Sequence, residues 1–416
     1  MEFKAKFKIP ASLCTKCRGA KLLCGLSFCP ITVKSIVKPR VNISQGNRIS
    51  GSSPPSVFVG RYGYPKVKVY PSVPQVHGDT SSYEDPKEWM NLQLEDFLSM
   101  RLSMIRGGTD VYVKNAADPD KLFQELQLMA LSEKYVEVDM TLEKNLSEMS
   151  VILDENTPPM GPSAPLLKFQ SDYSSPSLSV EKVYGDTDLK AMDAMKFLYS
   201  RNEDVSKISK ILSVGAIGTK KMRKVVPTRW SITAVDKNLS DDLIEKSKDY
   251  PQIDKFLAYV RRTNGNLFVA ILTPSNWIYE WGEAWGRGTT WNQWGEETYT
   301  EIDNEGYYGR KDYPGIGGCY YSTRLAVGEK LNEMRRSGGA ITWREIYPGF
   351  SLPVGVWYVR ENMRELFKMK PSEFDTLDDA LKFVSKFLNV PLKNWLQRST
   401  VVKTLKYNNL EKFFSI

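Results

Sequence analysis

Apolar and polar positions follow two periods along the 416-residue chain, so both strands and helices are expected. Residues 135–140, YVEVDM, are apolar at every second position, which is typical of a strand with one buried face. The segments SITAVD (231–236) and NLFVAILT (266–273) also predict strands, each with at least one buried face. Residues 319–336 have the apolar spacing of a helix, which should end at the glycine pair 338–339.

Helix-start signals occur at three further places. The sequence DPKE at 85–88 combines a capping Asp, a Pro at the first helical position and a capping-box Glu, and predicts a helix to about residue 105. Asp-Pro at 118–119 predicts another helix start, and Thr and Asp at 376 and 379 predict a helix to residue 388. Because the elements show no repeating βαβ order, the pattern predicts a mixed α/β or α+β body.

Composition adds limits to this picture. Apolar residues make up 41% of the chain and charged residues 25%, which permits a substantial core. No apolar run approaches the roughly 18 residues of a membrane helix, and the first ten residues lack the apolar centre of a signal peptide. We therefore expect a soluble intracellular protein without a membrane partner.

Four of the five cysteines lie within sixteen residues. Cys14, Cys17, Cys24 and Cys29 have the spacing C-x2-C-x6-C-x4-C, which suits four thiolates around one zinc ion. An iron–sulfur cluster, a disulfide pair and unliganded thiols are the alternatives. We expect one structural zinc ion, because all four coordination positions would be filled by protein.

The net charge of +8 is concentrated at the N-terminus. Residues 1–50 contain ten Lys and Arg and one acid, Glu2, while the remainder of the chain is nearly neutral. A basic segment of this kind favours phosphate contacts with nucleic acid over a merely solubilising role.

Three turns carry arginine beside glycine or a basic run: GRYG (60–63), RGG (106–108) and KKMRKVVPTRW (220–230). In such turns the backbone can approach a ligand closely, and Arg-Trp can combine a phosphate contact with base stacking. Each turn alone is equally consistent with an ordinary solvated loop. The phosphate- or nucleic-acid-binding candidates are Arg61, Tyr62, Arg106, Lys220, Lys221, Arg223, Lys224, Arg229 and Trp230.

Five of the ten tryptophans fall within 277–294, interleaved with or followed by carboxylates. Buried core is the favoured interpretation of this tract. The alternative is a base-stacking cleft whose carboxylates hold a metal ion or act on a flipped nucleotide. The chain has a single histidine, His77, so nucleophile–histidine chemistry is not expected, and no catalytic residue is assigned.

The tail at 407–416, YNNLEKFFSI, ends on aromatic side chains. Leu410, Phe413 and Phe414 would share one face of a short helical turn and fit one apolar pocket. The spacing resembles the PIP box by which replication and repair proteins bind the sliding clamp PCNA, with Tyr407 in place of the usual Gln. A final helix packed on the chain's own core is the alternative.

Taken together, LCTKCRGAKLLCGLSFCP, PPSVFVGRYGYPKV, RKVVPTRWSITAVD and the terminal box resemble the archaeal Nre family of DNA repair proteins, NreA type. The resemblance spans almost the whole chain and implies DNA damage repair, a four-cysteine zinc module and PCNA binding. It supplies no catalytic residue. The expected division is a basic zinc module at 1–37, a linker at 38–56, an N-terminal region at 57–290, a C-terminal region at 291–396 and a clamp-binding tail at 397–416.

The preferred hypothesis is a DNA repair factor that binds DNA, is recruited to PCNA, and works in the cytoplasm on the chromosome. The alternative is an enzyme, hydrolase- or nuclease-like, that acts on nucleic acid or a nucleotide through a phosphate-binding arginine pocket. A third hypothesis is RNA processing. Whether the protein is an enzyme is left open.

Overall fold

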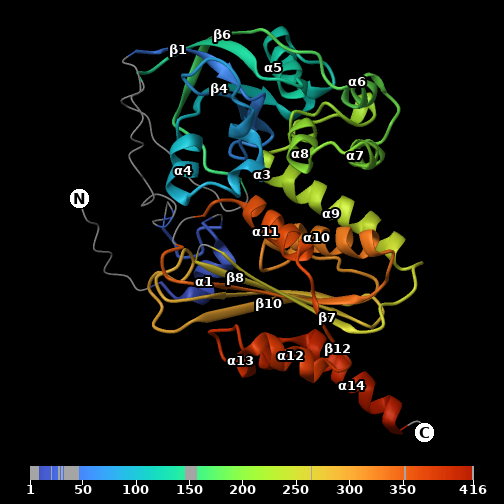
Figure 1. Cartoon of the computed structure of the whole chain (residues 1–416). Helices are drawn as coiled ribbons and strands as arrows, with labels where there is room; N and C mark the ends of the chain where they lie inside the picture. The colour runs from blue at the N-terminus through green and yellow to red at the C-terminus, as the bar shows by residue number, and fades with distance from the viewer. Residues whose placement is uncertain are drawn as a thin grey trace. The chain divides into compact units, whose positions relative to one another are not determined.

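Two six-stranded sheets organise the chain in the computed structural model, one in each of two units (Figure 1). One unit is Ser35–Leu239; the other combines Met1–Lys34 with Ser240–Ile416. The expectation of a mixed α/β body is confirmed. The structure describes residues 9–19, 21–26, 29, 31, 46–145, 157–263, 265–350 and 353–414, with the backbone alone for 408–414.

The sheet of the Ser35–Leu239 unit has the strand order β1-β5-β6-β4-β3-β2. The β4–β6 pair is parallel and the other pairs are antiparallel. Exposed and buried positions alternate along β5, as the sequence predicts for 135–140. The strands are β1 (Arg48–Ser53), β2 (Ser56–Val59), β3 (Lys66–Val73), β4 (Ile105–Tyr112), β5 (Val136–Leu142) and β6 (Ser163–Ser171).

The second half of the expected linker, 38–56, is part of this sheet. Strand β1 pairs with β5 over its full length, so the linker prediction is wrong from Arg48 onward. A Cβ atom at Gly51 would lie 2.1 Å from the Pro74 carbonyl oxygen. Gly51, which contributed to the resemblance to a linker, therefore allows two backbones to approach closely.

The helix expected from 85–88 to about 105 is interrupted. Asp85 caps α3 (Pro86–Trp89), its carboxylate accepting from the Lys87 backbone N–H at 2.8 Å. The helix ends at Trp89, and the next helix, α4 (Leu94–Leu102), begins after a short turn. A continuous helix would separate residues 89 and 97 by about 12 Å along its axis. The break instead brings the Trp89 and Phe97 rings to 5.2 Å, and both side chains are buried.

Helices α5 and α8 contact β2. Helix α5 is capped by Asp120, two residues after the expected start at 118–119. The remaining helical elements of this unit are η1 (Ser81–Glu84), η2 (Val113–Ala116), α5 (Lys121–Leu131), α6 (Leu178–Gly185), α7 (Ala191–Ser200), α8 (Val205–Ser213) and η4 (Lys220–Met222).

Residues 231–236, expected as a strand, lie inside the helix α9 (Thr228–Ser247), so that prediction is wrong. Ser231, Val235 and Leu239 are buried, and their steps of four residues follow one helix face. This period becomes visible over twenty residues, whereas the six-residue window imitates an alternating strand.

The sheet of the other unit has the order β10-β9-β11-β8-β7-β12, with β9 and β11 parallel and the other pairs antiparallel. Strand β8 occupies 266–273 as predicted, and β8, β9 and β11 are buried along their whole length. The strands are β7 (Phe256–Thr263), β8 (Asn266–Thr273), β9 (Tyr279–Trp285), β10 (Tyr299–Glu305), β11 (Gly339–Ile346) and β12 (Ser372–Phe374).

Helices cover both faces of this sheet (Figure 1). Helices α10 and α11 pack together on one face, and α12, α13 and α14 lie on the other, where Trp343 and Trp395 stack at 4.9 Å. The helices predicted at 319–336 and after Thr376 are confirmed as α10 and α12. The helices are α1 (Ala11–Cys17), α10 (Cys319–Met334), α11 (Val356–Lys368), α12 (Leu377–Ser385), α13 (Leu392–Arg398) and α14 (Thr400–Phe414).

Among the described residues, none of the helices has both the length and the apolar character needed to cross a membrane.

Candidate functional site

The four clustered cysteines line one small pocket. Cys14 and Cys17 lie on α1, and Cys24 and Cys29 follow in the loop after it. Apolar side chains complete the wall: Ile9, Leu13, Leu22, Ile31, Trp291 and Trp294. A short helix followed by Arg18 and Gly19 with positive φ turns the chain back, so that cysteines ten and fifteen residues apart reach the same place.

The surroundings of Cys14 disfavour the deprotonated form of its thiol. Burial, together with the nearby sulfurs of Cys29, Cys17 and Cys24, raises its pKa to about 12. A soft cation would reverse this preference, and four thiols are the donor set that zinc prefers. As the described side chains stand, however, no group of three or more Cys, His, Asp or Glu is arranged to hold a metal ion. The donor chemistry fits zinc, while the ligand geometry is not formed.

Arg18, between the second and third cysteines, is inserted into the sheet of its own unit. Its Nη2 donates to Glu283 Oε2 at 3.0 Å, and its guanidinium lies over the Trp285 ring at 5.0 Å. Glu283, on β9, also accepts from Arg344 Nη1 at 3.2 Å. No local sequence signal reveals this contact, which links positions 265 residues apart.

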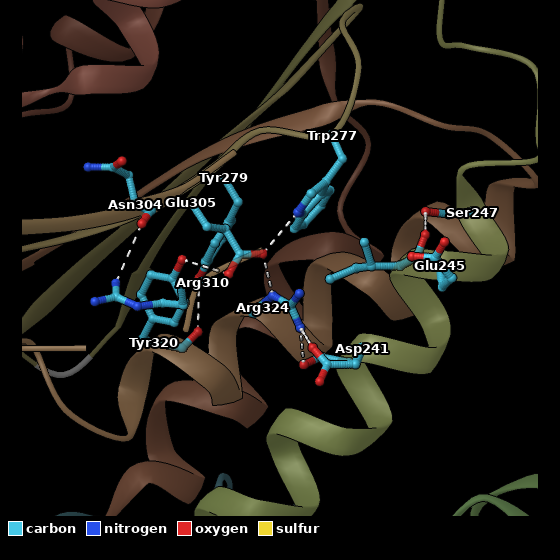
Figure 2. A network of polar contacts seen from close by, with 12 residues as sticks. Asp241, Glu245, Ser247, Trp277, Tyr279, Asn304, Glu305, Arg310, Tyr320 and Arg324 are labelled. Atoms are coloured by element: carbon cyan, nitrogen blue, oxygen red, sulfur yellow. Dashed lines mark hydrogen bonds and ion pairs between the residues drawn. The ribbon is translucent and has the colours of Figure 1, made fainter. Parts of the chain in front are cut away.

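A second buried polar network lies where β10 meets α10 (Figure 2). Glu305 accepts from Trp277 Nε1 at 2.9 Å, from Arg324 Nε at 2.7 Å and from the Tyr320 hydroxyl at 3.1 Å. Arg324 Nη1 also donates to Asp241 Oδ1 at 2.7 Å, so the network ties α10 to the end of α9.

Protonation in this network favours a structural role. Burial and the Glu305 charge raise the pKa of Tyr320 far above its usual value, and burial raises that of Tyr279 as well. The Tyr279 hydroxyl donates to the Tyr320 carbonyl oxygen at 3.0 Å. These tyrosines therefore remain protonated donors and do not act as bases near neutral pH.

The Trp/Glu tract follows the core interpretation. Trp277, Trp281, Trp285 and Trp291 are buried, and Trp294 is half-buried. Glu280 accepts from Trp343 Nε1, Ser399 Oγ and the Val401 N–H, and burial raises its pKa despite these donors. In the described part of the tract, these side chains therefore pack and form hydrogen bonds in the core. No base-stacking cleft is found among these described residues.

Two of the proposed phosphate-binding arginines are internal. Arg106 is 7% exposed, stacks on Phe58 and Tyr70, and donates to the Gly161 carbonyl oxygen at 2.9 Å. Arg223 is buried and donates to the carbonyl oxygens of Gly218, Tyr184 and Asp186. Their guanidinium groups hydrogen-bond to carbonyl oxygens of loops. The prediction that Arg106 and Arg223 bind phosphate at the surface is therefore wrong.

Other candidates meet on the surface of the Ser35–Leu239 unit. The turn after β2 places the Tyr64 ring 5.4 Å from the Trp230 ring, and the Arg61 guanidinium lies 4.9 Å from the Tyr62 ring centre. Lys224 is exposed and Arg229 is half-buried. Lys220 and Lys221 are exposed on η4. Tyr64 was missed as a site residue, although it follows the GRYG turn directly.

The C-terminal helix α14 is buried near its start and exposed at Tyr407. Val401, Val402 and Leu405 are buried, whereas Tyr407 is 71% exposed. The backbone is helical to Phe414. The other proposed clamp contacts, Leu410, Phe413 and Phe414, have side chains outside the described residues, so their prediction stands as made.

Comparison with known proteins identifies the family. The model described as "Archaeal Nre, N-terminal" matches residues 23–292, and "Archaeal Nre, C-terminal" matches 305–413. The chain belongs to the archaeal Nre family. The resemblance noted in the sequence is therefore confirmed. The two models divide the Nre chain between residues 292 and 305, while the two compact units divide at residues 239 and 240.

Curated Nre relatives cover nearly the full length. DNA repair protein NreB of Archaeoglobus fulgidus is 46% identical over 401 residues, 96% of this chain and 99% of the relative. DNA repair protein NreA of the same organism is 36% identical, over 92% and 95% of the two chains. DNA repair protein NreA of Haloferax volcanii is 34% identical, over 87% and 88%. No solved structure matches the chain.

Proposed function

We propose that this Nre chain acts in DNA repair, binding DNA directly and reaching its sites through the sliding clamp PCNA. The observation that carries the proposal is the near full-length similarity to three proteins named as DNA repair proteins. The exposed Lys, Arg and aromatic side chains near Tyr64 and Trp230 support the DNA-binding part.

The clamp interaction is supported by the course of α14. The helix is held to the sheet by Val401, Val402 and Leu405, and Tyr407, two residues further along, is exposed. A clamp-binding peptide needs this combination of a fixed root and an accessible end. Leu410, Phe413 and Phe414 would enter the apolar pocket of the clamp, each contributing roughly 1.5–3 kcal/mol.

A zinc ion held by Cys14, Cys17, Cys24 and Cys29 completes the proposal. Zinc would neutralise the thiolates and cross-link α1 to the following loop, a structural role without an open coordination position. The shared pocket and the set of four sulfur donors support it. Side-chain rotation within the pocket would be needed to bring the sulfurs into a tetrahedral ligand set.

Calorimetric titration of the cognate clamp tests recruitment. We expect the full chain to bind and the Phe413→Ala/Phe414→Ala double variant to lose at least about 100-fold in affinity, since two anchors are removed. Lys393→Ala, exposed on α13, is the control and should bind like the wild type. Equal binding by the double variant and the wild type, or no binding by either, would assign the phenylalanines to another role.

A further inference from the structure

Two aromatic side chains of the Ser35–Leu239 unit lie together on its surface. Exposing their rings to water costs free energy that a bound ligand would recover. Tyr64 and Trp230 are 51% and 46% exposed, and their ring centroids are 5.4 Å apart with a 52° angle between the rings. Burying such rings is favourable, so large exposed aromatic faces commonly mark binding surfaces. Tyr62 and Tyr112 are also exposed.

Tertiary structure assembles this surface from three segments. The Val59 N–H donates to Thr228 Oγ1 at 2.8 Å, which joins the end of β2 to the start of α9. The Val113 N–H donates to the Pro65 carbonyl oxygen at 3.0 Å, and the Val225 N–H donates to the Val113 carbonyl oxygen at 2.8 Å. The turn at 60–65, the end of β4 and the segment 224–230 are therefore held side by side.

The turn itself has little freedom. Gly63 has φ of +83°, and a Cβ atom there would lie 2.6 Å from the Lys66 carbonyl oxygen. The Lys66 N–H donates to the Gly63 carbonyl oxygen at 2.9 Å, closing the turn. The aromatic side chains are consequently presented from a defined backbone, which lowers the entropy lost on binding.

The three segments that carry these rings also carry positive side chains. Lys66 lies 5.9 Å from the Tyr112 ring centre, and Lys114 and Lys224, exposed, lie next to the hydrogen-bonded pair Val113 and Val225. Asp110 pairs with both Lys66 and Lys68, at 3.4 and 2.9 Å, so one acid faces two lysines here.

We infer that this surface, formed by Arg61, Tyr62, Tyr64, Lys66, Tyr112, Lys224 and Trp230, binds single-stranded DNA. Unpaired bases stack on Trp230 and Tyr64, and the lysines and Arg61 contact phosphates. Bases inside a duplex are already stacked and cannot reach these rings, whereas every unpaired base offers an aromatic face. The inference deepens the proposed function and rests on its DNA-binding part.

Fluorescence anisotropy with the full chain tests the stacking step. The probes are a thymidine strand of about 20 nucleotides, an abasic deoxyribose-phosphate strand of equal length, and a duplex of equal length. We expect the wild type to prefer the thymidine strand. Trp230→Ala should weaken that binding about tenfold or more, while binding to the abasic strand changes little.

Matched variants separate stacking from charge and folding. Tyr173→Ala removes an aromatic side chain of similar exposure elsewhere in the unit and should bind like the wild type. Lys224→Gln should weaken binding to all three probes and reduce the salt dependence by about one phosphate contact. Unchanged thermal unfolding of Trp230→Ala and Tyr64→Ala verifies that both variants fold.

The outcomes distinguish the two levels of the proposal. If the wild type binds all three probes and Trp230→Ala binds the thymidine strand equally well, the stacking surface is wrong and DNA binding stands. If the wild type binds none of the DNA probes, both are wrong. Tighter binding to a uridine RNA strand than to the thymidine strand would overturn the assignment to DNA.

Discussion

Several buried carboxylates among the described residues accept hydrogen bonds from nearby donors. Glu283 meets Arg18 and Arg344, Glu305 meets Arg324 with an indole and a phenol, and Glu345 accepts from the Val390 N–H at 3.0 Å. A buried charge without such partners would cost several kcal/mol or become neutral. At this scale, a glutamate among tryptophans indicates a hydrogen-bonded core more strongly than a catalytic centre.

Glu84 is a partly buried carboxylate whose contribution to folding stability should depend on pH. Burial acts to raise its pKa, but the positive charges of Arg101 and Lys210 and the hydrogen bonds from Arg101 and Ser56 prevail, so the pKa is lowered from 4.5. A lowered folded-state pKa stabilises the protein above the unfolded-state value and loses that effect as pH falls through the folded value.

We therefore expect Glu84→Gln to be less stable than the wild type at pH 7 by about 1–3 kcal/mol. The difference should shrink as pH falls below about 4.5, because Glu84 of the unfolded wild type is protonated first, and it should vanish once pH passes the lower folded-state pKa. Urea unfolding at a series of pH values measures it, with the exposed Glu143→Gln as control. A difference that is constant with pH would contradict this account.

At the scale of elements, helix α14 is tied to the sheet by one buried residue of β9. Glu280 Oε2 accepts from Ser399 Oγ at 2.7 Å and from the Val401 N–H at 3.1 Å, and the Val402 N–H donates to Ser399 Oγ at 3.0 Å. A carboxylate and a hydroxyl thus satisfy the first N–H groups of the helix that carries the tail.

Ser399→Ala should destabilise the protein by about 1–3 kcal/mol, because a buried carboxylate loses a donor and the helix loses its cap. Protease cleavage within α14 should become faster, since the root of the helix is loosened. Ser385→Ala, in the last turn of α12, is the matched control and should change neither property. Chemical unfolding and limited proteolysis provide the measurements.

The elements also show where pattern reading succeeds. Strand β8 coincides with the predicted 266–273 because an apolar run flanked by turn residues has few alternatives. Residues 231–236 were assigned to a strand because six residues can satisfy both periods. The helix predicted over 85–105 is interrupted, and Trp89 packs against Phe97 across the interruption, a contact that no local signal contains.

For the unit that contains the cysteines, Arg18 is the link between a short N-terminal segment and a long-range sheet. It follows Cys17 directly, and its guanidinium reaches Glu283 on β9. The proposed zinc ion would hold the loop that presents Arg18. Metal binding and the stability of this unit should therefore be coupled.

Removing the metal tests this coupling. The purified full chain should contain about one zinc per molecule, and chelation should lower its thermal stability. Arg18→Met should cost on the order of 3 kcal/mol in the zinc-loaded protein, because Glu283 loses a buried partner. The two effects should be less than additive, since the metal acts partly through Arg18.

Lys16→Met, an exposed change between the first two cysteines, is the control for Arg18→Met. Elemental analysis gives the zinc content and calorimetry the stability. Strict additivity of chelation and Arg18→Met would show that the metal and Arg18 act independently. A zinc content near zero in protein purified without chelator would contradict the metal proposal.

The sequence alone determined the family, the mixed α/β class, the cysteine spacing and the position of elements with long, unambiguous periods. The family and the cysteine spacing follow from motifs of neighbouring residues, whereas the class and the element positions follow from local periodicity. The tertiary structure decided which side chains lie on the surface, where they can bind a ligand, and which are buried. Arg106 and Arg223 became internal, Tyr64 met Trp230 across 166 positions, and Arg18 entered the core. Burial and contact between distant segments depend on how strands and loops pack, and no window of the sequence contains that information.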